Sequence, residues 1–319
     1  MDLNTLTTEI LNGKKITKEE AHLLYKEPLE ILCEKANQIR IHFCKNQFDL
    51  CAIINAKSGH CSENCKFCAQ SIYHRTQIKT YPLLSGEQIF SEAERNSEAG
   101  ILRYSIVTSG KRLSEIEIDK ICEVIKTIKE KLGIQVCVSL GLLNKEQFQK
   151  LKEAGVTRIH NNLETGRKNF PNICTTHHFD DKIRTIKEAQ SVGLEVCSGG
   201  IFGIGESTED RIDMAFTLRE LNIKSVPINI LNPIPGTSYG ESEILKNSDL
   251  RRIVALYRFI LPKASIRLAG GRGLLSDKGE SCFLSGANAA ISGDMLTTCG
   301  ISAETDTKML QSLGFEIHL

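Results

Sequence analysis

The sequence lacks both an excess of charge of one sign and a long hydrophobic run. Its 40 basic and 39 acidic residues give a formal net charge of +1, and no block of like charges stands out. This excludes the electrostatic signature of a protein that binds nucleic acid or a membrane surface. No stretch approaches the roughly 18 consecutive apolar residues of a membrane-spanning helix. We therefore expect neither a nucleic-acid partner nor a membrane partner.

Export and linker signals are missing as well. The first residues, MDLNTLTTEILNGKKITKEE, contain no basic start followed by an apolar run and a small-residue cleavage site, so we expect a cytoplasmic protein. No low-complexity stretch divides the chain. A content of 41% hydrophobic and 25% charged residues is typical of a globular protein with a substantial core.

Short β-rich runs alternate with amphipathic helical segments. Strands are predicted at 50–55, 102–108, 134–140, 156–162, 194–200, 225–231, 264–269 and 287–291. Helix starts are indicated by capping boxes at Thr17–Glu20, Ser85–Gln88, Ser114–Glu117 and Asn144–Gln147. The pattern predicts an α/β fold: a single (β/α)8 TIM barrel over residues 50–319, preceded by an N-terminal helical extension over residues 1–49. A doubly wound open sheet is the alternative, because alternation alone does not decide whether the sheet closes.

Cysteine is abundant, and three of the twelve cysteines are clustered. Cys61, Cys65 and Cys68 follow the first predicted strand at the spacing C-x3-C-x2-C. Clustered thiols in a reducing compartment indicate metal binding or catalysis, since disulfides are disfavoured there. A structural zinc site requires four ligands, which His60 or Cys51 would complete. An iron–sulfur cube held by three cysteines instead leaves one iron open to a small molecule.

The stretch SGHCSENCKFCAQS, with Phe67 before the last cysteine, resembles the cluster loop of the radical S-adenosylmethionine enzymes. The resemblance implies a 4Fe-4S cluster on Cys61, Cys65 and Cys68, with S-adenosyl-L-methionine bound at the open iron. In that family an electron from the cluster cleaves the cofactor, and the resulting 5′-deoxyadenosyl radical abstracts hydrogen from the substrate.

Further matches run through the chain in VCVSLGLL, NNLET, VCSGGIFGIGES, SVPINIL, SIRLAGGR and FLSGANAAISGDMLTT. Together they resemble the biotin synthase family over nearly the whole length. The resemblance implies a homodimer that converts dethiobiotin to biotin, with sulfur from an auxiliary iron–sulfur cluster and electrons from a flavodoxin- or ferredoxin-like donor. The alternative is a barrel of the hydrogenase-maturase or aminomutase-like type, with the same first motif and no sulfur insertion.

A second site deep in the barrel is indicated by polar residues in the middle of strands. Cys137, Cys197 and Arg267 lie where a barrel normally packs aliphatic side chains inward. A buried arginine needs a charge partner or hydrogen-bond acceptors. The three residues together therefore indicate a ligand set.

At this second site the chain departs from the family. The family's auxiliary 2Fe-2S cluster is held by three cysteines and this arginine, and the position of one cysteine is occupied here by Ser105, a poorer ligand for iron. Three interpretations are open: Ser105 ligates weakly, fewer protein ligands are used, or Cys51 substitutes. In the last case Cys51, Cys137 and Cys197 would hold a four-iron type of cluster beside Arg267. Cys282 and Cys299 are further candidates.

The resemblance also implies residues for the cofactor and the substrate. Those for S-adenosyl-L-methionine are Phe67, Asn162, Glu164, Lys182, Gly200 and Ile201, and those for dethiobiotin are Asn162, Asn229, Thr297 and Thr298. Lys182 replaces an arginine that pairs with the cofactor carboxylate, so it keeps the charge but loses the forked geometry. His177 and His178 are expected on the surface. No general acid–base pair is expected, because the cofactor performs the difficult chemistry.

Overall fold

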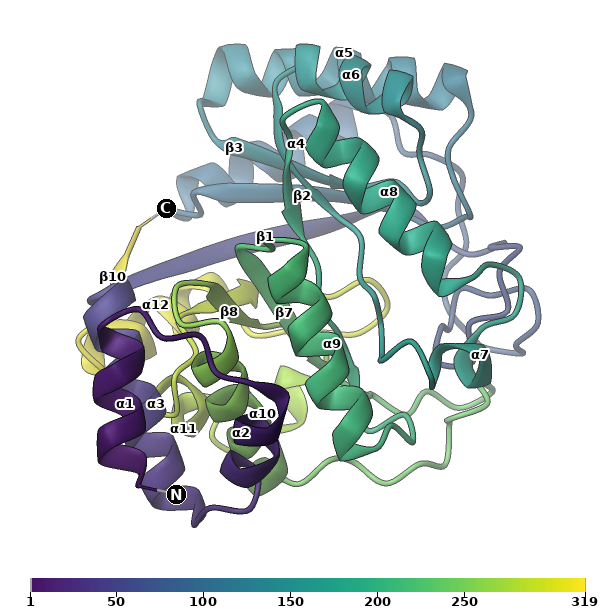
Figure 1. Ribbon diagram of the computed structural model, residues 1–319. Helices are drawn as coiled ribbons and strands as arrows, with labels where there is room; N and C mark the ends of the chain where they lie inside the picture. Colours follow the sequence, from purple (N-terminus) through teal and green to yellow (C-terminus); the bar gives the residue numbers. More distant parts are fainter. Residues whose placement is uncertain (1, 319) are drawn as a thin grey trace.

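The strands of the computed structural model, which describes residues 2–318, close into a parallel barrel (Figure 1). Around the barrel run β1 (Gln47–Lys57), β2 (Arg103–Thr108), β3 (Gln135–Ser139), β4 (Val156–His160), β5 (Glu195–Cys197) with β6 (Gly200–Phe202), β7 (Ser225–Ile230), β8 (Ser265–Leu268) and β9 (Ala289–Ser292). The last of these, β9, pairs in parallel with β1. The predicted eight-stranded (β/α)8 barrel is therefore confirmed, and the open sheet is excluded.

Helices connect the strands on the outside of the barrel. They are α4 (Gly86–Glu98), α5 (Glu115–Leu132), α6 (Lys145–Glu153), α7 (Phe170–Ile173), α8 (Phe179–Ser191), α9 (Thr208–Glu220) and α10 (Asn247–Ile260). The four predicted capping boxes are present at the starts of α2 (Lys18–Leu24), α4, α5 and α6. Each side chain that caps a helix satisfies backbone N–H groups of the first turn that have no partner within the helix.

The N-terminal segment is helical, as predicted. It forms α1 (Leu3–Leu11), α2 (Lys18–Leu24) and α3 (Leu29–Cys44), which pack against one another and against α9 and α10. After β9 the chain forms α12 (Ala303–Ser312) and a short strand, β10 (Glu316–Ile317), beside the start of β1. The division into an extension over 1–49 and a barrel over 50–319 stays a prediction.

The prediction of one continuous strand over residues 194–200 is wrong. The strand is interrupted between β5 and β6, because the backbone at Gly199 approaches β7 closely. A Cβ atom at Gly199 would lie 2.0 Å from the carbonyl oxygen of Pro227, and one at Gly200 would lie 2.5 Å from the carbonyl oxygen of Glu164. Only glycine fits this crossing, which turns the chain toward the end of β4.

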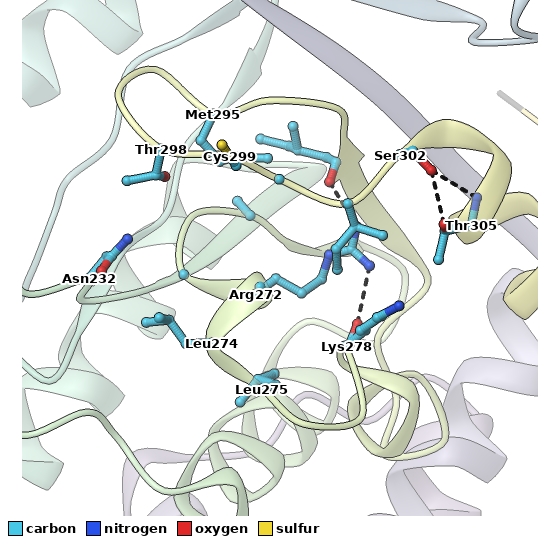
Figure 2. Close-up of a pocket in the computed structure, with 16 residues that line it drawn as sticks. Asn232, Arg272, Leu274, Leu275, Lys278, Met295, Thr298, Cys299, Ser302 and Thr305 are labelled. Carbon is cyan, nitrogen blue, oxygen red and sulfur yellow. Dashed lines mark hydrogen bonds between the residues drawn. The ribbon is translucent and has the colours of Figure 1, made fainter. Parts of the chain in front are cut away.

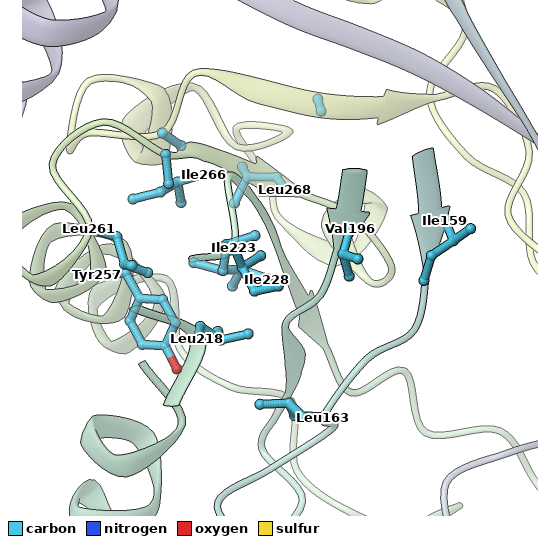
Figure 3. Packing of buried hydrophobic residues seen from close by; sticks show 14 of the residues in the cluster. Ile159, Leu163, Val196, Leu218, Ile223, Ile228, Tyr257, Leu261, Ile266 and Leu268 are labelled. Atoms are coloured by element: carbon cyan, nitrogen blue, oxygen red, sulfur yellow. The ribbon is translucent and has the colours of Figure 1, made fainter. Parts of the chain in front are cut away.

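Side chains alternate between the barrel interior and the outer layer. Figure 3 shows Ile159, Val196, Ile266 and Leu268 in the apolar layer between the strands and Leu218 and Tyr257 of the helices. Their neighbours along the strands, among them Cys197 and Arg267, line the interior cavity. This is the alternation that the polar mid-strand residues indicated. Within residues 2–318, no helix has the length and apolar character needed to cross a membrane.

Candidate active site

A single cavity of about 400 Å³ runs from the three-thiol loop into the barrel. At its mouth it is lined by Cys61, Cys65 and Cys68, and at its deep end by Cys51, Cys137 and Cys197. Residues expected to hold cofactor or substrate lie between these two thiol sets: Phe67, Asn162, Glu164, Ile201, Asn229, Thr297 and Thr298. The cavity therefore joins residues that are far apart in the sequence, since the carboxyl ends of all barrel strands open on one face.

The three-thiol loop begins with a backbone turn that glycine permits. Gly59 has φ +77 and His60 has φ 51, and the backbone then brings Cys61 back against Ser71. A short turn in which the N–H of Cys68 donates to the carbonyl of Cys65 at 3.0 Å holds the other two cysteines. His60 is exposed and does not line the cavity, so it does not complete a four-ligand site from that side.

A fourth cysteine that the sequence did not single out lies against the loop. The Sγ atom of Cys174, just after α7, lies 3.7 Å from the Sγ atom of Cys65 and 3.3 Å from Nδ1 of His177. The hydrogen bond that Cys65 donates holds the pKa of Cys174 at about 3, while the same bond raises the pKa of Cys65. The two sulfurs are therefore close enough to share one proton.

The prediction that His177 is a surface residue is wrong. Its side chain is 5% exposed, and Nδ1 lies 2.5 Å from Oε2 of Glu63, which is also buried. The ring packs edge-on against Phe170 of α7, which explains why a histidine in a polar segment is covered. His178 is exposed, as predicted, and lies at the start of α8.

Glu164 occupies a position suited to a polar ligand. It follows β4 with φ 70, a left-handed conformation that non-glycine residues seldom adopt. Its backbone is fixed by hydrogen bonds with Gly199 and Ile201 at 3.1 and 2.8 Å. Its Oε2 atom is buried and has no hydrogen-bond partner among residues 2–318. A buried carboxylate oxygen left free in a cavity fits a ligand that brings hydroxyl donors.

The amide side chains at the site are held in fixed orientations. Asn162 Oδ1 accepts from the N–H of Gly199 at 3.0 Å, which leaves its amide nitrogen for the cavity. Asn229 on β7 donates to the carbonyl of Gly200 at 3.0 Å and accepts from the N–H of Gly270 at 2.9 Å. Lys182, on α8, does not line the cavity, and its charge only slightly opposes the rise in the pKa of Cys65 that the contact with Cys174 and burial cause.

At the deep end, Arg267 is paired as a buried arginine must be. Its Nη2 lies 2.7 Å from Oδ2 of Asp49, and its Nη1 donates to Cys51 Sγ at 3.0 Å and to the carbonyls of Asp49 and Ala290. Although burial opposes ionisation, Arg267 and its neighbours Arg158 and Arg103 hold the pKa of Asp49 at about 2. The guanidinium group thus has its partners within the protein.

The three deep cysteines differ in their ease of ionisation. Burial raises the pKa of Cys51 to about 12 and that of Cys137 to about 11. Burial acts on Cys197 in the same direction and is the largest single cause, but the hydrogen bond and charge of His160, together with the charges of Arg267 and Arg158, lower the pKa to about 7. Ser105 on β2 lies in register with Cys137 on β3 and also lines the cavity.

Arg103, Arg158 and His160 are site residues that the sequence reasoning missed. All three line the cavity near the deep thiols. Arg103 and Arg158 are polar residues within strands, which is the same signal that identified Arg267. Arg103, Arg158 and Arg267 are buried, and the carboxylates that pair with them are those of Asp49 and the partly exposed Glu195. This excess of buried cations favours an anionic group at this end of the barrel.

Of the two further candidate ligands, neither reaches the main cavity. Cys282 is fully buried in α11 (Glu280–Phe283), outside the barrel interior. Cys299 is exposed and lines a neighbouring cavity of about 460 Å³, which Figure 2 shows beside Thr298 and Arg272. The structure therefore leaves Cys51, Cys137 and Cys197 as the thiols at the deep end, with Ser105 and Arg267 beside them.

Both thiol sets fit iron–sulfur clusters. Three thiols at the mouth give an incomplete ligand set, and the orphaned oxygen of Glu164 marks space for a polar molecule beside it. Thiolates are the ligands that such clusters require.

Family models match both parts of the barrel. The radical SAM superfamily model matches residues 56–218, and the biotin and thiamin synthesis associated domain matches residues 227–316. Among solved structures, methylornithine synthase gives a TM-score of 0.86 at 20% identity, covering 98% of this chain and 97% of that one. The hydrogenase maturase of Carboxydothermus hydrogenoformans gives 0.83 at 17% identity, covering 98% and 78%. These likenesses show the fold alone. With the superfamily match, the cysteine loop defines a radical S-adenosylmethionine barrel enzyme.

Curated relatives define the family more closely. The chain is 57% identical over 319 residues to a biotin synthase of Brachyspira hyodysenteriae, covering 100% of this chain and 96% of the relative. It is 54% identical over 316 residues to that of Akkermansia muciniphila, covering 99% and 98%. It is 57% identical over 309 residues to that of Clostridium botulinum strain Alaska E43, covering 97% of each. The chain belongs to the biotin synthase family.

Proposed function

We propose that this enzyme converts dethiobiotin to biotin by radical sulfur insertion. The observation that carries the proposal is the single cavity that connects the three-thiol loop with a second set of thiols. A radical formed at the mouth and a sulfur source at the deep end would then act on one substrate held between them. The hydrogenase-maturase or aminomutase-like alternative has no use for the deep set of Cys137, Cys197 and Arg267.

Different residues of the chain would bind the 4Fe-4S cluster and S-adenosyl-L-methionine. Cys61, Cys65 and Cys68 would hold the 4Fe-4S cluster, which supplies the electron that cleaves S-adenosyl-L-methionine. Glu164 would accept hydrogen bonds from the ribose hydroxyls of the cofactor, with Asn162, Phe67, Gly200 and Ile201 around it. Lys182 would contribute its charge near the cofactor carboxylate.

Dethiobiotin would bind through neutral hydrogen bonds. A urea ring needs both donors and acceptors, which Asn162 and Asn229 offer. The hydroxyl groups of Thr297 and Thr298, which also line the cavity, would hold the substrate carboxylate. These residues orient the substrate and exclude water, and the radical performs the hydrogen abstraction.

At the deep end, Cys51, Cys137 and Cys197 would hold a four-iron type of auxiliary cluster, which supplies the inserted sulfur. The contacts of Arg267 support this assignment, because its Nη1 already donates to Cys51, Asp49 and Ala290 and its Nη2 is ion-paired with Asp49, although Nη2 has no hydrogen-bond partner among residues 2–318. The competing assignment is a two-iron cluster with Ser105 and Arg267 as ligands.

The auxiliary cluster is tested on a variant that lacks the first cluster. Cys61, Cys65 and Cys68 are replaced by alanine, and iron and acid-labile sulfide are counted after anaerobic reconstitution. We expect about four irons per chain. Two irons and two sulfides would overturn the four-iron assignment and favour Ser105 with Arg267.

The reaction itself is tested by an anaerobic assay with dethiobiotin and S-adenosyl-L-methionine, in which 5′-deoxyadenosine and biotin are followed together. Deoxyadenosine with no biotin would favour the maturase-like alternative.

We propose further that the enzyme acts in the cytoplasm as a homodimer and receives electrons from an acidic flavodoxin- or ferredoxin-like donor. Light scattering tests the dimer.

A further inference from the structure

Cys174 has no place in the binding roles above, yet its sulfur lies 3.7 Å from that of Cys65, and hydrogen bonds join the segments that carry the two residues. Asn64 Oδ1 accepts from the backbone N–H groups of Thr175 and Thr176 at 2.9 and 3.2 Å. The N–H of Lys66 donates to the carbonyl of Ile173 at 2.9 Å. The three-thiol loop is therefore bonded on both sides of Cys65 to the segment that carries Cys174.

Cys174 itself is held in a fixed position. It is 4% exposed, with Nδ1 of His177 at 3.3 Å from its sulfur and Oγ1 of Thr176 at 3.5 Å. His177 in turn is fixed by Glu63, at 2.5 Å from its Nδ1. These contacts hold the side chain of Cys174 with its sulfur against that of Cys65.

Cys174 is badly placed to be a ligand of the same cluster. It does not line the cavity that contains Cys61, Cys65 and Cys68, so it lies behind Cys65 as seen from the cluster site. A separation of 3.7 Å is also too short for the sulfurs of two cysteines on different irons of one cube. Cys65, Cys174 and His177 lie within 4.8 Å of one another and would suit a single metal ion, but only by removing Cys65 from the cluster.

The direction of the hydrogen bond between Cys65 and Cys174 is fixed when Cys65 binds iron. A cysteine bound to iron is a thiolate and carries no proton, so only Cys174 has an S–H group to donate. The other polar atoms near this sulfur are already engaged. Asn64 Oδ1, at 3.4 Å, accepts from two backbone N–H groups, and Thr176 Oγ1, at 3.5 Å, accepts from the N–H of Asn64. His177 Nδ1, at 3.3 Å, is bonded to Glu63 Oε2. The thiolate is the stronger acceptor because it is charged.

We infer that Cys174 is a positioning residue that donates an S–H hydrogen bond to the Cys65 thiolate and so raises the reduction potential of the 4Fe-4S cluster. Hydrogen bonds to the cysteine sulfurs withdraw charge from a cluster and favour its reduced, more negative state. The inference rests on the proposed assignment of Cys61, Cys65 and Cys68 as cluster ligands. It adds a determinant of electron transfer that lies outside the cavity.

The test is a redox titration of the anaerobically reconstituted full chain, followed by the electron paramagnetic resonance signal of the reduced cluster. That signal is identified by its change when S-adenosyl-L-methionine is added. We expect Cys174→Ala to keep its iron but to have a more negative midpoint potential than the unmodified enzyme. Cys174→Ser keeps an O–H donor at this position and should retain most of the original potential.

Cys122→Ala is the matched control, because Cys122 lies on α5 outside the barrel interior and its loss should leave the potential unchanged. A proton that exchanges in deuterated buffer and couples to the reduced cluster should be present in the unmodified chain and lost in Cys174→Ala. An unchanged potential in Cys174→Ala at full iron content would overturn the inference. So would equal shifts in the alanine and serine variants, or loss of iron from both, which would identify Cys174 as a ligand.

Failure of this inference is distinguishable from failure of the proposed function. The potential is measured without dethiobiotin, so it does not depend on which substrate is converted. An enzyme that forms deoxyadenosine but no biotin would reject the sulfur-insertion reaction and leave the Cys174 measurement valid. An enzyme that makes biotin, but whose cluster potential does not change in Cys174→Ala, would support the sulfur-insertion reaction and reject the role of Cys174.

Discussion

At the scale of single residues, Asp49 is the buried charge on which the deep site depends. It lies at 2.7 Å from Arg267 and 3.3 Å from Arg158, and it is 8% exposed. We expect Asp49→Asn to lower the unfolding free energy of the iron-free chain by about 3–5 kcal/mol, because it leaves the buried guanidinium group of Arg267 without its counter-charge, whereas Arg158 keeps Glu195. Urea denaturation measures the loss.

The effect of Asp49 should depend on pH in a predictable direction. Its pKa in the folded chain is about 2, below the usual 3.8 of an aspartate. The ionised carboxylate therefore contributes its full share of the unfolding free energy at every pH well above 3.8. That contribution is lost as the pH falls toward 2, so the difference between the variant and the original chain should narrow there. Asp180→Asn removes an exposed ion pair with Arg167 and should cost at most about 1 kcal/mol. A gap that stays constant from pH 5 to pH 2 would show that Asp49 does not act through its charge.

At the scale of elements, neighbouring strands offer two positions for one cluster ligand. Cys51 on β1 pairs with Arg103 on β2, and Ser105 lies two residues further along β2. Both positions line the cavity, so a thiol on either strand would reach the deep end. In the chain that lacks Cys61, Cys65 and Cys68, we expect Cys51→Ser to lose most of its auxiliary iron, and Cys51→Ser with Ser105→Cys to regain a cluster.

Iron and sulfide counts check this exchange between the strands. Cys122→Ser removes a thiol from the outer layer and should leave the iron content unchanged. Full iron retention in Cys51→Ser alone would mean that Ser105 and Arg267 suffice as ligands. Failure of the double variant to regain iron would show that the two positions are not equivalent.

The sequence predicted elements better than it predicted contacts. Strand alternation, capping boxes and the inward cysteines were readable because periodicity is local, and the loop motif identified one cluster site. Burial of His177 was not readable, since it depends on Glu63, 114 residues earlier in the chain, and on how the ring of Phe170 packs against it. The break at Gly199 was missed for the same reason, as its cause is the carbonyl of Pro227 on another strand. Cys174 carried no local signal at all.

At the scale of the whole molecule, charge is balanced overall but not on the surface of the cluster loop. The chain has a formal charge of +1, yet residues 61–81 contain one acid, Glu63, which is buried. Lys66, Arg75 and Lys79 are exposed in the same segment, beside the exposed side chains of Ile72 and Tyr73. An apolar centre with a basic rim next to the cluster ligands suits an acidic electron donor.

This surface predicts a salt-dependent rate of reduction. We expect Lys66→Glu with Lys79→Glu to slow reduction by an acidic ferredoxin or flavodoxin about tenfold at low ionic strength, because steering of the donor is lost. The difference should fade as salt shortens the range of the charges. Lys45→Glu with Lys263→Glu makes the same change in net charge at the opposite ends of the strands, where both side chains are exposed, and should leave the rate unaltered. Stopped-flow measurement with the protein donor, beside dithionite as a small reductant, separates docking from damage to the cluster. Equal slowing with both reductants would mean that the substitutions damage the cluster, and an unchanged rate with the protein donor would place the donor elsewhere on the molecule.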